Sequence, residues 1–281
     1  MPALETVSEQ ACFGGVQGTY RHDSRECASP MRFSVYRPPQ AAKSRVPVLY
    51  FLAGLTCTEE TFMVKAGAQR LAARLGLMLV APDTSPRVPR HPGDDGSWDF
   101  GLGAGFYLDA TEAPWREHYR MFSYVSVELP ELVGAHFPGD TSRQGIFGHS
   151  MGGHGALVCA LRLPERYRSV SAFAPVAAPS QVPWGENAFS GYLGEDREAW
   201  AAYDATALAP RSAFRGRVLV DQGEADPFLA SQLRPEAFEQ ACRGTGIEVR
   251  LRRHPGYDHS YWFVQTFVAD HLRHHAGALS R

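Results

Sequence analysis

The sequence contains the pentapeptide Gly148-His149-Ser150-Met151-Gly152, which fits the pattern G-x-S-x-G. A short apolar run ends just before it, and an apolar helical pattern from Met151 to Arg162 follows. A serine on a sharp turn between a strand and a helix projects its hydroxyl from the sheet, and small neighbours let the two elements approach closely. This setting predicts that Ser150 is the nucleophile of an acyl-transfer reaction. The alternative is a glycine-rich turn around a buried structural serine.

A serine hydroxyl is a weak nucleophile, so it needs a base to accept its proton. Around such an elbow the base is a histidine that comes last in the chain, in a loop after a strand. His259 follows a predicted strand that ends near Leu251 and is the expected base. The alternative is His254, which lies close to the end of that strand. His149 is expected to pack beneath the turn at the substrate pocket, and His154 to point away from it.

The base needs a carboxylate that holds its ring in the correct tautomer, and this residue is expected between the serine and the histidine. The predicted strand over 218–221 ends at Asp221, and two further acidic residues, Glu224 and Asp226, follow it. Asp221 is expected to lie within that strand, so Asp226 is predicted to be the acid. Asp258 is adjacent to His259 and is expected to be a loop or cap residue, because neighbouring side chains rarely face each other.

Acyl transfer also requires hydrogen-bond donors for the oxyanion. The backbone N–H of Met151, directly after the serine, is one expected donor, and a loop after the third strand supplies the other. That loop begins at Gly54, and the N–H of Leu55 is the predicted second donor. Cys57 lies in the same loop and is expected to line the pocket rather than to act as a nucleophile.

The elements that must position these residues alternate along the chain. Apolar runs of strand length separate longer stretches of helical periodicity, which predicts βαβ units. The predicted strands are 46–53, 77–81, 144–148, 169–174, 218–221 and 247–252, and the predicted helices are 61–75, 119–137, 151–162, 228–242 and 261–274. Because the strands are continuously apolar, we expect an α/β fold with a mostly parallel central sheet that helices cover on both faces.

Three segments depart from this alternation. Residues 31–36 alternate between apolar and polar and predict an antiparallel strand at the sheet edge, and Pro130 is expected to kink or break the helix over 119–137. Residues 87–111 and 175–208 are rich in glycine or proline and are expected to be loops over the active site, since ligand sites of open α/β sheets form after strands. No linker divides the chain, so a single domain over 1–281 is expected.

Composition excludes several classes of protein. Lysine plus arginine is 28 and aspartate plus glutamate is 30, which gives a net charge of −2 and argues against a nucleic-acid binding protein. No apolar run approaches the length of a membrane span, and the N-terminus lacks the pattern of a signal peptide. The five cysteines are widely spaced, which favours a reduced, cytoplasmic protein. His271, His274 and His275 could share a helix face, but a solvated helix end is expected there rather than a metal site.

Several blocks of sequence resemble the S-formylglutathione hydrolases, also called the esterase D family. They are Cys12-Phe13-Gly14-Gly15, Met31 to Tyr36, Leu52 to Glu60, Pro82 to Arg87, Trp98 to Asp109, Gly148 to Ala156, Pro183-Trp184-Gly185 and Gly256 to Tyr261. They occur in the family's order from about residue 12 to residue 263. The resemblance implies an α/β-hydrolase fold and a cytosolic serine hydrolase without a cofactor or a metal, commonly a homodimer.

The activity that the resemblance implies is hydrolysis of a small-molecule thioester, S-formylglutathione, to formate and glutathione, as in formaldehyde removal. It implies a triad of Ser150, Asp226 and His259, oxyanion donors at Leu55 and Met151, and a pocket that includes Cys57 and Trp184. Glu186-Asn187 replaces a pair that usually includes a lysine, which predicts weaker binding of glutathione. The alternatives are a general carboxylesterase or thioesterase, an acyltransferase and a binding module without activity.

Overall fold

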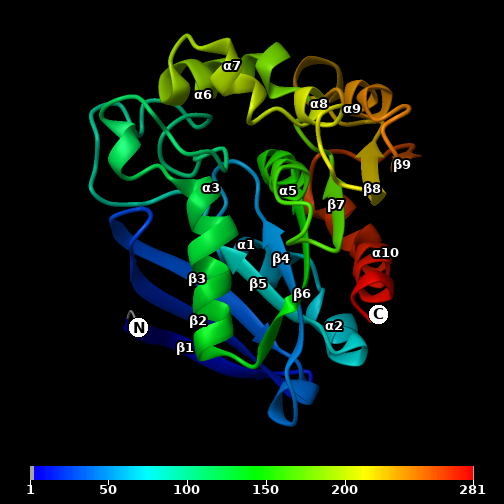
Figure 1. Ribbon diagram of the computed structural model, residues 1–281. Coiled ribbons are helices and arrows are strands. Elements are labelled where there is room, and N and C mark those ends of the chain that lie inside the picture. The colour runs from blue at the N-terminus through cyan, green and yellow to red at the C-terminus, as the bar shows by residue number, and fades with distance from the viewer. Residues whose placement is uncertain (1–2, 281) are drawn as a thin grey trace.

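A computed structural model describes residues 3–280, and its centre is one nine-stranded sheet (Figure 1). The strand order is β1-β2-β3-β5-β4-β6-β7-β8-β9. The pairs from β5 to β9 are parallel, and those that join β1, β2, β3 and β5 are antiparallel. The strands are β1 Leu4–Cys12, β2 Gly15–Ser24, β3 Ser29–Arg37, β4 Val46–Leu52, β5 Met78–Pro82, β6 Gly139–His149, β7 Ser169–Phe173, β8 Gly216–Gly223 and β9 Ile247–His254. The expected α/β class with a mostly parallel sheet is confirmed.

Helices cover both faces of the sheet. On one face α10 packs against β6, β7 and α2, and on the other α4 and α5 pack against β6 (Figure 1). The α-helices are α1 Thr61–Lys65, α2 Gln69–Leu75, α3 Met121–Ser123, α4 Leu129–His136, α5 Met151–Arg162, α6 Pro183–Leu193, α7 Arg197–Ala201, α8 Ala205–Leu208, α9 Pro235–Ala241 and α10 Tyr261–Leu279. The short 3-10 helices are η1 Pro39–Ala42, η2 Trp115–Glu117 and η4 Pro179–Gln181, and the π-helices are η3 Tyr124–Glu128 and η5 Leu229–Leu233. No helix within residues 3–280 has both the length and the apolar character of a membrane span.

The N-terminal part of the sheet differs from the prediction. The strand over residues 31–36 is antiparallel as expected, but it does not lie at the edge, because β1 and β2 extend the sheet beyond it. The side chains of β1 are mostly exposed. A two-sided solvated strand lacks the apolar periodicity by which a strand is found in a sequence, so β1 was missed. β2 is half buried, but its buried positions include the polar residues Thr19, His22 and Ser24, so it gave no apolar pattern either.

Two predicted helices are interrupted. The helix expected over 61–75 is two helices, because Gly67 has a φ of 65° and turns the chain between α1 and α2. The helix expected over 228–242 changes from η5 to α9 at Arg234, which has a φ of 49° and precedes Pro235. A residue before proline disfavours the α conformation, which ends the first segment there.

The break expected at Pro130 in the predicted helix over 119–137 does not occur, because α3, the π-helix η3 and α4 follow one another without a gap from Met121 to His136. The chain passes through α3 and the π-helix η3 before α4, and Pro130 lies in the first turn of α4. Proline has no N–H, so the carbonyl oxygen of Ser126, four residues earlier, has no helical donor from it. The guanidinium of Arg166 donates a hydrogen bond to that oxygen instead.

Residues 87–111 form an irregular loop, whereas 175–208 is more regular than expected. The second segment contains η4, α6, α7 and α8. The side chain of Asp204 accepts hydrogen bonds from the N–H groups of Thr206 and Ala207 at the start of α8, and Asp196 caps α7 in the same way. Single capping residues between prolines and glycines start these helices. The helices are too short to show the apolar periodicity by which a helix is predicted from a sequence.

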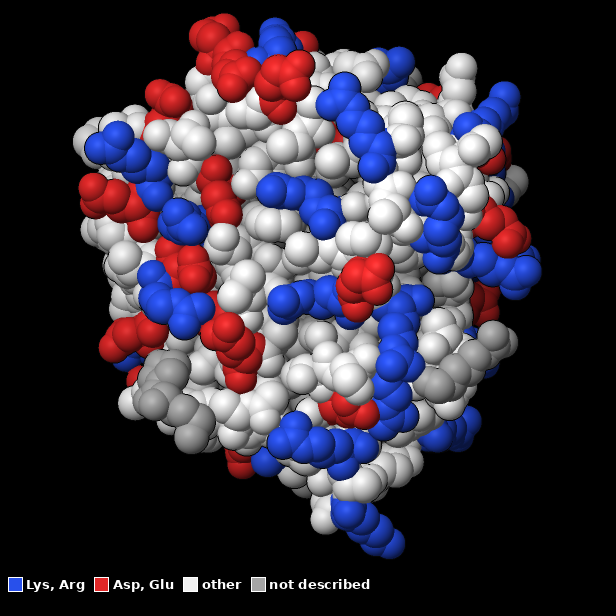
Figure 2. Space-filling model, in the orientation of Figure 1, with Lys and Arg blue, Asp and Glu red and all other residues white. Residues whose placement is uncertain are grey.

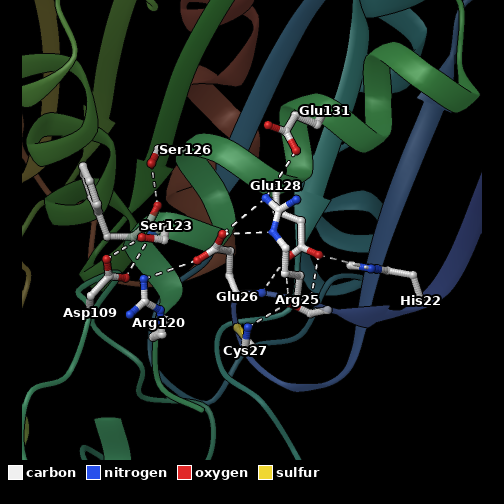
Figure 3. A network of polar contacts seen from close by, with 12 residues as sticks. His22, Arg25, Glu26, Cys27, Asp109, Arg120, Ser123, Ser126, Glu128 and Glu131 are labelled. Atoms are coloured by element: carbon white, nitrogen blue, oxygen red, sulfur yellow. Dashed lines mark hydrogen bonds and ion pairs between the residues drawn. The ribbon is translucent and has the colours of Figure 1, made fainter. Parts of the chain in front are cut away.

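A buried carboxylate joins the β2–β3 turn to η3. Glu128 accepts hydrogen bonds from the Ser24 hydroxyl at 2.6 Å and from the N–H groups of Arg25 and Glu26 at 2.7 and 3.0 Å (Figure 3). Three donors from one turn satisfy a charge that would be costly to bury alone. The antiparallel extension is thereby fixed to the helical layer.

Acidic and basic side chains are interspersed on the face of the molecule that Figure 2 shows. This mixture is in keeping with the net charge of −2.

The C-terminal histidines are not a solvated helix end. His271 and His275 are fully buried on α10, and both rings contact the hydroxyl of Ser171, at 2.8 Å each. His275 also contacts the Ser169 hydroxyl at 2.7 Å, and His274 contacts the Val170 carbonyl. The prediction was wrong because α10 continues five residues beyond 274 and packs on the sheet. These histidines hold α10 against β7.

Candidate active site

The structure brings Ser150, His259 and Asp226 together at the carboxyl ends of the parallel strands. The Oγ of Ser150 lies 2.8 Å from Nε2 of His259, and Nδ1 of His259 lies 2.6 Å from Oδ2 of Asp226. The serine lies between β6 and α5, the aspartate follows β8, and the histidine follows β9. Each contact has the length of a strong hydrogen bond. The three side chains are therefore arranged for transfer of the serine proton to the imidazole.

Ser150 has a strained backbone with φ 60° and ψ −121°. Its N–H donates to the Phe173 carbonyl of β7, and its own carbonyl accepts from the N–H of His154, each at 3.0 Å. A Cβ atom at Gly152 would lie only 1.9 Å from the carbonyl oxygen of Leu52, so only glycine fits beside β4. The strain is of order 1–3 kcal/mol and persists because neighbouring elements impose it.

Asp226 is fixed by contacts besides His259. Its Oδ1 accepts the N–H of Phe228 at 2.8 Å, and the Gln222 amide lies 3.4 Å from its Oδ2. The aspartate side chain is wholly buried and that of His259 is 16% exposed. The ring of Phe228 stands edge-on to His259, 5.2 Å between centroids. These contacts leave the imidazole little freedom to turn away from the serine.

The residues of the two predicted oxyanion donors both lie next to the serine. Met151 is the first residue of α5, so its N–H belongs to the first turn, which helix geometry leaves without an intrahelical acceptor. A Cβ atom at Gly54 would lie 3.1 Å from the Cβ of Ser150, which places the loop of Leu55 against the nucleophile. The arrangement can place two N–H groups on one oxygen atom.

The loop that carries Leu55 is held by residues that sequence analysis did not single out. Thr56, at φ 66°, donates its N–H to the Gly103 carbonyl at 2.9 Å. The Tyr107 hydroxyl donates to the Ala53 carbonyl at 2.9 Å. The Cys57 carbonyl accepts from Arg87 at 3.0 Å. The partners Gly103, Tyr107 and Arg87 all belong to the irregular segment 87–111. The sequence signal for these contacts was the richness of that segment in glycine and aromatic residues.

A cavity of about 200 Å³ opens above the serine, and most of its wall is apolar or aromatic. Its lining residues are Gly54, Leu55, Cys57, Trp98, His149, Ser150, Trp184, Phe228, His259, Ser260 and Tyr261. Cys57, Trp184 and His149 thus lie where they were predicted, whereas Trp98, Phe228 and Tyr261 were missed. Burial raises the pKa of the Cys57 thiol above its ordinary value. A protonated thiol is a poor nucleophile, in keeping with the expectation that Cys57 lines the pocket and does not attack the substrate.

His149 forms one wall of this cavity. Its ring centroid lies 4.6 Å from that of His259, and neither of its ring nitrogens has a hydrogen-bond partner among the described residues. Burial, and secondarily the proximity of His259, hold the pKa of His149 well below its usual value. The ring is therefore neutral at physiological pH and adds no charge that would oppose formation of an imidazolium at His259.

The alternative residues lie outside the triad. Asp221 is within β8 as expected, and it pairs with Arg252 at 2.6 Å and His271 at 3.3 Å. Burial alone would raise the pKa of Asp221, but hydrogen bonds from His271 and Arg252 outweigh it and hold the pKa below its usual range. His254 lies in β9 and stacks on Phe267 with 3.8 Å between centroids. No cluster of three potential metal ligands occurs within residues 3–280.

His154 points away from the site, and its Nε2 donates to the Phe106 carbonyl at 3.0 Å. Burial lowers the pKa of His154 to about 4 from 6.5. The unfolded chain therefore binds a proton below pH 6.5 that the folded protein does not bind until about pH 4. We expect this one histidine to reduce the free energy of unfolding by up to about 1.4 kcal/mol per pH unit as the pH falls through that window.

Denaturant titrations at pH 7, 6 and 5 on the wild type and on His154→Gln test this expectation, because glutamine keeps an N–H donor for Phe106. As the pH falls, the free energy of unfolding of the variant should decrease less than that of the wild type. The difference corresponds to about one proton fewer taken up on unfolding, because the variant lacks the His154 imidazole. Identical pH dependence in the two proteins would contradict it.

Comparison with known proteins relates the whole chain to one group of enzymes. The Esterase family model matches residues 24–274. The S-formylglutathione hydrolase of Mus musculus is 55% identical over 99% of both chains, and that of Paracoccus denitrificans is 54% identical over 99% of both. The solved structure of an S-formylglutathione hydrolase from Agrobacterium tumefaciens superposes with a TM-score of 0.94 at 52% identity, over 98% of this chain and 99% of the other. Fold and sequence thus agree over nearly the full length.

Proposed function

The chain belongs to the Esterase family and, within it, to the S-formylglutathione hydrolases, and we propose that Ser150, His259 and Asp226 carry out its hydrolysis of S-formylglutathione. The single observation that supports this assignment of residues is the continuous set of contacts from Ser150 Oγ through His259 to Asp226, at 2.8 and 2.6 Å. A binding protein without activity has no need of such a set.

The proposed reaction begins with attack of Ser150 Oγ on the formyl carbon while Nε2 of His259 accepts the hydroxyl proton. The carbonyl oxygen becomes negative and is held by the N–H groups of Leu55 and Met151, each contributing about 3 kcal/mol of transition-state stabilisation by analogy with other oxyanion donors. The carbon–sulfur bond then breaks, and His259 passes its proton to the departing sulfur, so that glutathione leaves as its thiol and the imidazole is neutral again. Asp226 stabilises the imidazolium during this step and fixes its orientation.

Hydrolysis of the formyl-serine completes the cycle. His259 takes a proton from water, whose oxygen attacks the formyl carbon, and the collapse of the second intermediate returns a proton to Ser150 and releases formate. The cavity of about 200 Å³ above the serine supports a small acyl group. Its apolar wall of Trp184, Phe228 and Leu55 offers little to a larger polar acyl group.

The substrate is tested by kcat/KM for S-formylglutathione, S-acetylglutathione and p-nitrophenyl acetate under one set of conditions. We expect kcat/KM for the formyl thioester to exceed that for the acetyl thioester by about a hundredfold, since one carbon more or less in a hydrophobic pocket changes kcat/KM by about 10–200-fold. Equal or higher kcat/KM on the aryl ester would favour a general carboxylesterase that uses the same triad.

The homodimer and the cytoplasmic location implied by the resemblance stay predictions. Weaker binding of glutathione because of Glu186 also stays a prediction.

A further inference from the structure

The cavity above Ser150 holds the acyl group but not the whole substrate. Glutathione is a tripeptide, and an extended tripeptide spans about 10 Å. A space of about 200 Å³ that must also hold the acyl group leaves most of the peptide outside. The proposed activity therefore requires a second surface, next to the first, that binds a peptide with two carboxylates.

A larger cavity of about 670 Å³ adjoins the first one. The two share Ser260 and Tyr261 in their walls, and the second is completed by Val64 and Lys65 at the end of α1 and by Trp262 and Gln265 on α10. Val64 is 79% exposed and Trp262 is 77% exposed. Large apolar side chains that are exposed together at the rim of a cavity indicate a binding surface. We call this surface the α1–α10 groove.

Lys65 supplies a positive charge to the groove. Its Nζ lies 5.7 Å from the ring centroid of Tyr261, and that ring lies 5.6 Å from His149, which contacts His259. A continuous row of rings therefore leads from the catalytic base to the ammonium. Within the described residues 3–280, Lys65 forms no salt bridge with an acidic side chain, so its charge is available to a ligand.

The acidic residues nearby do not cancel this charge. Asp258 accepts hydrogen bonds from the N–H and the hydroxyl of Ser260 at 3.0 and 2.6 Å and lines neither cavity. Glu186 lies on α6 and lines neither cavity. An anionic peptide attached to the acyl group is thus attracted toward α1 and α10.

We propose that the α1–α10 groove binds the glutathione part of the substrate and that the ammonium of Lys65 pairs with one of its carboxylates. This inference rests on the proposed function. Val64 and Trp262 contact the apolar part of the peptide, while Tyr261 separates the peptide from the acyl cavity. Lys65 is a binding residue, so its removal affects KM for glutathione thioesters more than kcat.

The test compares two substrates, S-formylglutathione and p-nitrophenyl acetate, which carries no carboxylate. In Lys65→Met we expect KM for the thioester to rise about tenfold. The ratio of kcat/KM for the thioester to kcat/KM for the ester should fall by the same factor. Loss of one partly exposed hydrogen bond to a charged group has an effect of this size. Lys65→Arg should keep most of the ratio. The chain has only two lysines, and Lys43→Met, on the exposed end of η1, is the matched control that should leave both substrates unchanged.

The outcomes separate the subsite from the function. A wild-type enzyme that does not prefer S-formylglutathione overturns the proposed function and the subsite together. A wild type that prefers it, with an unchanged ratio in Lys65→Met, overturns the subsite alone. Sedimentation of Trp262→Ala gives a further check: a changed oligomeric state with an unchanged KM would identify the groove as a protein interface and overturn the proposal, whereas a raised KM at unchanged mass supports it.

Discussion

Replacement of Ser150 by alanine is expected to lower kcat by about 10⁵–10⁶-fold, since removal of the nucleophile of a comparable triad has an effect of this size. The hydroxyl is the only group of the residue that contacts His259. The fold should survive, because the backbone contacts of residue 150 with β7 and α5 do not involve the side chain. Turnover of S-formylglutathione and thermal unfolding, measured on the same preparations, test both statements.

An exposed serine provides the control for this variant. Ser142 lies near the start of β6 and contacts only Asp140 with its side chain, so Ser142→Ala should keep wild-type turnover. A fluorophosphonate probe should label the wild type and Ser142→Ala but not Ser150→Ala. A Ser150→Ala protein that lost only a few-fold in kcat, or that still reacted with the probe, would place the nucleophile elsewhere.

Replacement of Asp226 by asparagine is expected to lower kcat by about 10⁴-fold at neutral pH, as in other triads. The amide N–H₂ of asparagine donates to Nδ1 of His259, so the ring proton moves to Nε2. A protonated Nε2 cannot accept the proton of Ser150. The replacement is nearly isosteric, and the contact of Oδ1 with the Phe228 N–H is retained, so KM should change little.

Asp258→Asn is the matched control. Asp258 is adjacent to His259 in sequence, but its carboxylate accepts hydrogen bonds from Ser260 and, within residues 3–280, none from the His259 ring. This variant should retain kcat within about threefold, the effect of an exposed side chain on stability or activity being small. Equal losses in Asp226→Asn and Asp258→Asn would show that the general charge of the loop, rather than one oriented carboxylate, assists His259.

The contacts among Ser150, His259 and Asp226 could be predicted because each residue has a local signal. The elbow combines a short apolar run, small residues and an apolar helix within residues 144–162, and α5 begins and ends where that pattern does, at Met151 and Arg162. The acid and base follow strands in a fixed order. These features depend on neighbouring residues only, so no knowledge of the tertiary contacts was needed.

What was missed depends on contacts between distant segments. The support of the Leu55 loop comes from Gly103 and Tyr107, some fifty residues later. The burial of His271 and His275 depends on two serines of β7, about a hundred residues earlier. Histidine occurs both in buried and in exposed positions. A histidine near a helix end is therefore predicted to be exposed unless the strand that covers it is known.

The strained backbone of residue 150 belongs to its surroundings and not to serine itself. The Phe173 carbonyl, the His154 N–H and the glycine at 152 together dictate the conformation. A short synthetic peptide with the sequence of the elbow would therefore relax and carry no reactive hydroxyl. Conversely, the scaffold would impose the same outward projection on a cysteine placed there, so the chemistry of this position can be exchanged without redesign of the surrounding architecture.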